Sequence, residues 1–125
     1  MTPPDGVEDH GVRVLVTSAP VDQAESLTTR LVEAAHVNCV NLLPGARAIY
    51  RWQGTLEREL ETWMWMETHH TRLDACLRAL EAMHPYDVPK VLVVRPSDVA
   101  DAYAAWVRGD AATTSSGGAS PAETS

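Results

Sequence analysis

Alternating apolar and polar positions close to the N-terminus predict the first strand of the chain. The alternation consists of two interleaved sets of residues: Val12, Val14 and Val16 in one, and Arg13, Leu15 and Thr17 in the other. Leu15 makes the second face partly apolar, so both faces of the strand carry side chains that favour burial. We therefore expect this strand to lie in the centre of a sheet.

Two later segments repeat apolar residues at helical spacing and are predicted to be helices. The first has Asp22 three positions before Glu25, which is typical of a capped helix start, and is predicted to run to about His36. The second is predicted to open at Thr71 and to end at Pro85. The apolar stripes are Ala24, Leu27, Leu31 and Ala34 in the first helix, and Leu73, Leu77, Leu80 and Met83 in the second.

The segment between these helices has the pattern of a long β-hairpin. Cys39–Leu43 is apolar and β-prone, Pro44-Gly45 interrupts it, and Ala46–Trp52 resumes an extended pattern, which indicates a bulge or bend at the interruption. Gln53-Gly54 provides a chain reversal, because glycine accepts a positive φ. The run Leu56–Thr68 then forms the returning arm.

The returning arm presents two different faces. Leu56, Leu60, Thr62, Met64 and Met66 share one face, and Glu57, Glu59, Glu61, Trp63, Trp65 and Glu67 share the other. The first face is predicted to belong to the core. Because large exposed aromatic side chains usually mark a contact surface, the second is predicted to be a subunit interface.

A short apolar strand, Val91–Val94, is predicted to be buried, and a final helix capped by Pro96-Ser97 is predicted to extend to Gly109. The order β-α-β-β-α-β plus one helix predicts the α+β class. The predicted fold is a ferredoxin-like split β-α-β sandwich with a long β-hairpin and an extra C-terminal helix. Residues 12–108 are expected to form this domain, between a flexible tail at residues 1–11 and a disordered tail at residues 109–125.

Composition limits the range of functions. The 125 residues fit one domain, with 45% hydrophobic and 22% charged residues. A net charge of −7 argues against a nucleic-acid partner. No apolar stretch has the length of a signal-peptide core or a membrane span, so a cytoplasmic location without membrane contact is expected. The two cysteines, Cys39 and Cys76, form no paired motif and are expected to be free buried thiols.

Several strings between Val12 and about Val107 resemble the CutA family of divalent-cation tolerance proteins. They are Val14-Leu-Val-Thr-Ser-Ala-Pro, Cys39-Val-Asn-Leu-Leu-Pro-Gly-Ala, Tyr50-Arg-Trp-Gln-Gly, Glu57-Arg-Glu-Leu-Glu and His84-Pro-Tyr-Asp-Val-Pro. The resemblance implies a homotrimer whose hairpins pair between subunits, and a role in the response to copper and other divalent metals. It does not imply an enzyme. A trimer would also cover the unpaired edges and the tryptophans of the hairpin.

The resemblance also implies candidate metal ligands. In the family, copper binding is associated with a cysteine in the first strand and with a His-His pair before the Pro-Tyr turn; here Val16 and Met83-His84 stand at these positions. The ligand set for copper or another divalent metal is therefore reduced to His84, with Met83 as a soft partner for Cu(I). The alternative for Met83 is core packing, since it continues the stripe of the second helix.

A ligand cleft is predicted to be lined by Trp52, Glu67, His84, Tyr86 and Lys90. Related sequences usually carry a lysine and a glutamate where Glu67 and Lys90 stand. This exchange of both signs suggests that the two side chains form an ion pair, within one subunit or between two.

Two further clusters could bind metal but have simpler interpretations. Glu57, Glu59 and Glu61 share one strand face and could form an oxygen-rich cluster for hard cations, or be solvated residues paired with arginines. His69 and His70 are adjacent in an extended segment, so their side chains point apart and are expected to be solvated turn residues.

Two functions from different classes fit this sequence. The first is a trimeric module that binds a small ligand or a metal in clefts between subunits; the second is a structural or signalling trimer, of PII-like topology, without direct metal binding. A nucleotide-binding regulator is disfavoured because the long strand is acidic. No Ser-His-Asp order, phosphate-binding glycine loop or HExxH motif supports catalysis.

Overall fold

The structure, a computed structural model, describes residues 8–110 and shows the predicted order of elements with a four-stranded antiparallel sheet. The sheet has the order β2-β3-β1-β4, which is the order of a ferredoxin-like fold. The bounds of its strands are Val12–Pro20 for β1, Cys39–Trp52 for β2, Thr55–His69 for β3 and Leu92–Val94 for β4. The helices are Val21–Glu33 for α1, Leu73–Met83 for α2 and Asp101–Ala105 for α3.

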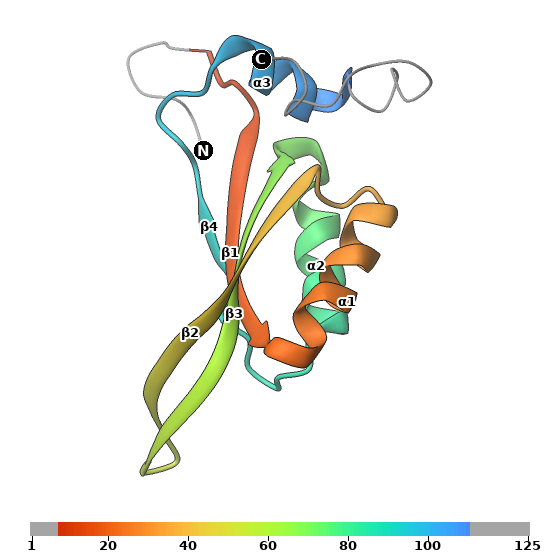
Figure 1. Cartoon of the computed structure of the whole chain (residues 1–125). Coiled ribbons are helices and arrows are strands. Elements are labelled where there is room, and N and C mark those ends of the chain that lie inside the picture. The colour runs from red at the N-terminus through yellow and green to blue at the C-terminus, as the bar shows by residue number, and fades with distance from the viewer. Residues whose placement is uncertain (1–7, 111–125) are drawn as a thin grey trace.

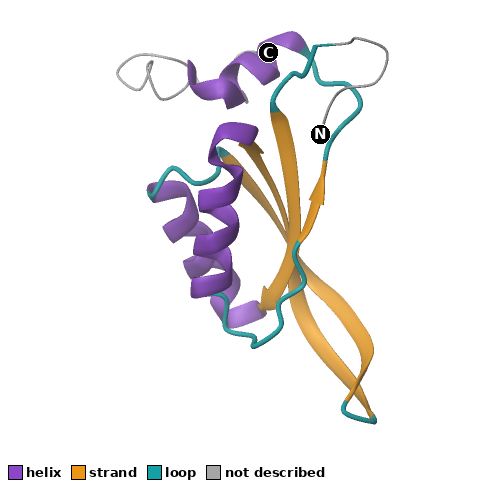
Figure 2. Cartoon of the chain, turned by 180° about the vertical axis from the view of Figure 1, so that it is seen from behind, coloured by secondary structure: helices purple, strands orange, loops and turns teal. Residues whose placement is uncertain are grey.

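The central position predicted for β1 is confirmed, since it pairs with β3 on one side and with β4 on the other. Helices α1 and α2 lie together on one face of the sheet (Figure 1, Figure 2). Leu15, Leu27, Leu31, Met64, Met66, Leu80 and Cys76 form most of the core between these layers. Burial raises the pKa of the Cys76 thiol to about 11. Both cysteines are free, but Cys39 is only half-buried rather than buried.

The hairpin of β2 and β3 is confirmed, with a bulge between Pro44 and Ala46 and a turn in which Gln53 and Gly54 both have positive φ. Its outer half extends past the helices (Figure 1). The prediction that Leu56 and Leu60 belong to the core is therefore wrong for a single chain, where they are 56% and 60% exposed. No helix layer reaches that far along the strand, whereas Thr62, Met64 and Met66 are buried as predicted.

Some predicted helix boundaries need correction. Helix α1 begins directly after Pro20, with Asp22 inside its first turn and no side-chain cap, and it ends at Glu33. A short 3-10 turn, His70–Arg72, precedes α2. The last helix begins at Asp101 rather than at Pro96-Ser97, and its chain continues as a wide turn to Asp110.

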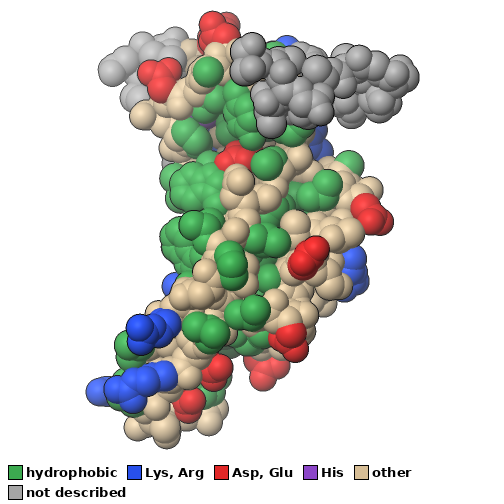
Figure 3. Space-filling model, viewed as in Figure 1, with side chains coloured by type: hydrophobic (Ala, Val, Ile, Leu, Met, Phe, Trp, Pro, Cys, Tyr) green, Lys and Arg blue, Asp and Glu red, His purple; other side chains and the backbone are tan. Residues whose placement is uncertain are grey.

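The face of the sheet away from the helices is only partly covered by the described residues, and Val12, Val14 and Val16 of β1 are buried there. Trp63 and Trp65 are each 37% exposed there. The edge strand β4, predicted to be buried, is instead exposed along its whole length, because none of the described elements covers it. Figure 3 shows hydrophobic side chains gathered over the sheet, with charged side chains near the outer end of the hairpin. An apolar face of this extent is typical of a contact between subunits.

The predicted tails fall mostly outside the described residues, which exclude 1–7 and 111–125. Asp9, His10 and Gly11, which the sequence placed in the N-terminal tail, make hydrogen bonds to the sheet and its flanking loop. Residues 109 and 110 continue the turn after α3.

Candidate functional site

A pocket of about 730 Å³ lies between the outer half of β2 and the loop that follows α2. This volume is within the range of small-molecule sites. The lining residues come from β1, β2, β3 and the loop: Ser18, Arg47, Ala48, Ile49, Tyr50, Trp52, Glu61, Pro85, Tyr86, Asp87, Val88 and Lys90. Three of the five residues predicted for the ligand cleft, Trp52, Tyr86 and Lys90, are among them.

His84 fixes the loop to the sheet from behind the pocket. It follows the last residue of α2, and Nε2 donates to the backbone oxygen of Ser18 at 2.8 Å. Nδ1 accepts the backbone N–H of Tyr86 at 3.1 Å. These two hydrogen bonds, one from each ring nitrogen, fix the orientation of the ring. His84 thus positions Tyr86 rather than lining the pocket.

Tyr86 joins the loop to β3 through Glu61. Its hydroxyl donates to Oε2 of Glu61 at 2.5 Å, and its ring packs against His84 with centroids 5.0 Å apart. Burial, followed by this hydrogen bond and the charge of Glu61, raises the pKa of Tyr86 well above its usual value. Tyr86 therefore remains a hydrogen-bond donor at neutral pH, and it is held in the pocket wall by its contacts with His84 and Glu61.

The predicted acidic cluster separates in the structure. Glu61 is buried and lines the pocket, whereas Glu57 and Glu59 lie farther out along β3. Glu57, Glu59 and Glu61 occupy alternate positions of β3 and so share one face. Desolvation and the charges of Glu59, Glu57 and Glu61 raise the pKa of Tyr50. In the described part of the chain, however, no three His, Cys, Asp or Glu side chains are grouped to hold a metal ion.

The predicted copper ligands do not fit a metal ion within one chain. Both nitrogens of His84 are already hydrogen-bonded, which leaves no lone pair for a metal. Met83 packs against the core, in agreement with the alternative interpretation of its position. Hydrogen bonds account for the position of His84, and packing against the core accounts for that of Met83.

Glu67 lies apart from the pocket. Its carboxylate accepts hydrogen bonds from Nε1 of Trp65 and, at 3.1 Å, from the hydroxyl of Tyr103 on α3. Across the sheet, Glu67 on β3 pairs with Val14 on β1, and Val14 pairs with Val94 on β4. Lys90 lies four residues before Val94, so about 13 Å of extended chain separates Lys90 from the level of Glu67. An ion pair between Glu67 and Lys90 would therefore have to join two copies of the chain, and this pair stays a prediction.

The prediction that both histidines at the end of β3 are solvated is correct for one of them only. His70 is exposed, but His69 is buried at 8% exposure, and its Nδ1 accepts the backbone N–H of Thr71 at 3.3 Å. Burial, followed by the charges of His70 and Arg72, lowers the pKa of His69. His69 therefore caps the turn before α2, a role that the sequence pattern did not reveal.

Sequence reasoning missed four polar residues of the pocket, one of which, Ser18, lies on β1. Arg47 and Tyr50 lie on β2, and Asp87 lies in the loop after α2. The bulge after Pro44 re-aims the side chains of β2, so simple alternation along that strand does not indicate which of them face the loop. Tyr50 and Asp87 do occur in the strings that carried the family resemblance.

The fold and the pocket together define a ferredoxin-like α+β protein with a small-molecule-sized pocket beside the outer half of a long hairpin. Residues 12–110 match the model of the CutA1 divalent ion tolerance protein family. The chain belongs to this family.

Named relatives and solved structures agree with this assignment. The divalent-cation tolerance protein CutA of Pectobacterium atrosepticum is 38% identical over 95 residues, which cover 75% of this chain and 86% of that protein. The structure of CutA from Synechococcus elongatus has a TM-score of 0.76 and 34% identity, covering 86% of this chain and 97% of that one. The PII-like protein CutA from Nostoc sp. has a TM-score of 0.75 and 27% identity, with 78% and 95% of the two chains covered. Within residues 8–110, no helix combines the length and hydrophobicity needed to cross a membrane.

Proposed function

We propose that this protein is a cytoplasmic, non-enzymatic homotrimer that contributes to divalent-cation tolerance by binding a small ligand in the pocket between the hairpin and the loop after α2. One observation carries the proposal: Trp52, Tyr86 and Lys90 converge with the buried carboxylate of Glu61 on one pocket. Aromatic walls with a few fixed polar groups are characteristic of small-molecule sites. In the trimer, a neighbouring subunit would complete the cleft.

Direct chelation of copper through Met83 and His84 receives no support from their geometry. The response to metal would then be an indirect consequence of ligand binding. The alternative, a signalling or scaffold trimer that binds no metal, is favoured by one finding, the PII-like description of the similar Nostoc protein.

Native mass spectrometry of the purified assembly tests the pocket. The wild-type protein should retain a small molecule of defined mass, and the variant Trp52→Ala should lose it. Trp106→Ala, a change of the same size outside the pocket lining, should retain it. An assembly that carries no small molecule in either form would favour the scaffold function.

Calorimetric titration with Cu(I), Cu(II) and Zn(II) tests the metal site. If the ligand interpretation of His84 is wrong, wild type and His84→Ala will bind each ion with the same affinity. A loss of Cu(I) affinity in His84→Ala, with the fold intact, would restore His84 as a ligand.

A further inference from the structure

Two arginines face each other across the upper end of β1 and β4. Val14 pairs with Val94, so the register continued by one residue places Arg13 opposite Arg95. Both side chains are largely buried, with 10% and 14% of their surface exposed. Like charges directly opposite each other in a sheet destabilise it unless an anion lies between them. This pair therefore requires a negative partner.

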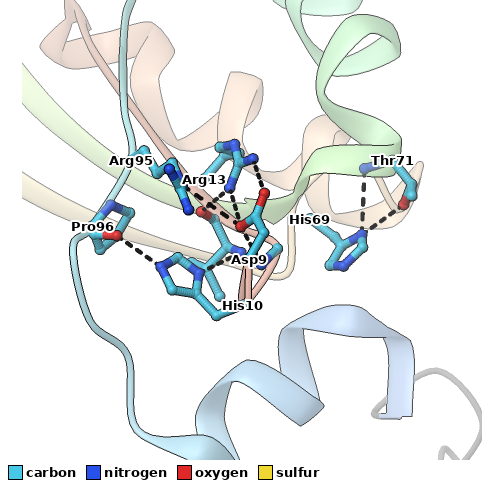
Figure 4. Close-up of polar contacts among 9 residues, drawn as sticks. Asp9, His10, Arg13, His69, Thr71, Arg95 and Pro96 are labelled. Carbon is cyan, nitrogen blue, oxygen red and sulfur yellow. Dashed lines mark hydrogen bonds and ion pairs between the residues drawn. The ribbon is translucent and has the colours of Figure 1, made fainter. Parts of the chain in front are cut away.

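The partner is Asp9, from the segment that precedes β1 (Figure 4). Its two carboxylate oxygens accept hydrogen bonds from the guanidinium of Arg13 at 2.6 and 3.1 Å, and Oδ1 also accepts the backbone N–H of Gly11 at 2.8 Å. The same oxygen lies 3.6 Å from Nε of Arg95. The hydrogen bond from Arg13, followed by that from Gly11, holds the pKa of Asp9 well below its usual range. Asp9 is therefore a fully charged anion in this cluster.

One carboxylate does not satisfy both arginines. Asp9 uses both oxygens on Arg13, and its distance to Arg95 is within reach of an ion pair but too long for a hydrogen bond. In the described part of the chain, Nε of Arg95 is buried and has no hydrogen-bond partner. Buried donors without a partner are rare, so this atom marks a place for another acceptor oxygen.

His10 holds the segment in place beside the cluster. Its Nε2 donates to the backbone oxygen of Pro96 at 2.7 Å, and its Nδ1 accepts the N–H of Val12 at 3.0 Å. Figure 4 shows His10 and Asp9 side by side against Arg13, Arg95 and Pro96. These contacts come from residues 9–11, which lie before the part of the chain that matches the family model.

We propose that Arg13 and Arg95 form an oxyanion-binding site that the chain's own Asp9 occupies, and that a small oxyanion takes the place of Asp9 when this carboxylate is withdrawn. A tetrahedral oxyanion such as phosphate has more acceptor oxygens than a carboxylate and can hydrogen-bond both guanidinium groups. Because Asp9 belongs to the same chain as the two arginines, it competes with free anions at an effective concentration on the order of millimolar. Free anions therefore bind weakly to the wild-type protein.

The full chain carrying Asp9→Ala tests this site. Its melting temperature should fall below that of the wild type and should rise again, in a saturable manner, with sodium phosphate, but not with sodium chloride at equal ionic strength. Calorimetry should give a phosphate affinity about tenfold tighter or more for the variant than for the wild type. A parallel titration with acetate distinguishes the sources of the oxyanion: rescue by acetate alone assigns the site to carboxylates, and stronger rescue by phosphate assigns it to phosphates.

Two further variants keep the test decisive. Asp9→Ala combined with Arg95→Gln should lose the phosphate response, because Arg95 supplies half of the site. Asp22→Ala removes an exposed carboxylate from α1 and should respond to phosphate as the wild type does. If Asp9→Ala unfolds, the nearly isosteric Asp9→Asn replaces it in the same titrations. Equal phosphate responses in the wild type, the Asp9 variant and Asp22→Ala would overturn the proposal and leave Asp9 as a structural ion-pair partner.

Discussion

At the scale of single residues, His84 connects three elements through two hydrogen bonds. His84→Ala would leave the carbonyl of Ser18 and the N–H of Tyr86 without partners and would open a small cavity. We expect a loss of about 2–3 kcal/mol in the free energy of unfolding, measured by urea denaturation. His84→Asn keeps an acceptor for Tyr86 and should lose less. A change below about 0.5 kcal/mol in His84→Ala would contradict the positioning role.

His69 makes the stability of the protein depend on pH. The unfolded chain takes up a proton at this residue near pH 6.5, whereas the folded chain, in which the pKa of His69 is lowered, takes it up only at lower pH. Stability is therefore fully present above about pH 6.5 and decreases as the pH falls below it, by at most about 1.4 kcal/mol per pH unit for one proton.

His69→Asn tests this contribution, because asparagine can still cap the turn before α2 but does not titrate. The decrease in unfolding free energy between pH 7.5 and 5.5 should be smaller in this variant than in the wild type. An unchanged slope in His69→Asn would assign the acid sensitivity to other groups.

At the scale of elements, the outer half of the hairpin leaves large apolar side chains exposed in a single copy. Ile49 and Leu60, on its two strands, are 63% and 60% exposed, and this half of the hairpin extends past α1 and α2 (Figure 1). If sister subunits cover these side chains, Leu60→Glu should shift the protein from trimer to monomer in sedimentation equilibrium. Val32→Glu on α1, at an apolar position that is 41% exposed, should leave the trimer intact. Equal masses for the two variants would count against the hairpin as the assembly element.

At the scale of the whole molecule, the charge pair of Glu67 and Lys90 can form only between copies. Glu67→Gln preserves hydrogen-bonding capacity toward Trp65 and Tyr103, so it removes charge with little other change. A double-mutant cycle with Lys90→Gln, read from the stability of the trimer, should give a coupling of about 0.5 kcal/mol or more if the side chains meet. Strictly additive effects would show that the two charges are independent.

The sequence by itself determined the order of the elements, the central place of β1, the bulge after Pro44 and the turn at Gln53-Gly54. These features follow from local periodicity and from residues with special backbone preferences, so short stretches of sequence are enough to predict them. The ligand cleft was instead predicted from the resemblance to related sequences, and three of its five residues, Trp52, Tyr86 and Lys90, line one pocket.

Only the tertiary structure decided which side chains are covered and which charges meet. It placed Glu67 away from the pocket, added Arg47 to it and brought Asp9 to a pair of arginines whose sequence positions are 82 residues apart. Burial of Leu56 or Leu60 likewise depends on how far the helices reach along β3, a distance that alternation within the strand does not encode. Contacts of this kind arise between segments distant in sequence, and packing selects them after the local elements have formed.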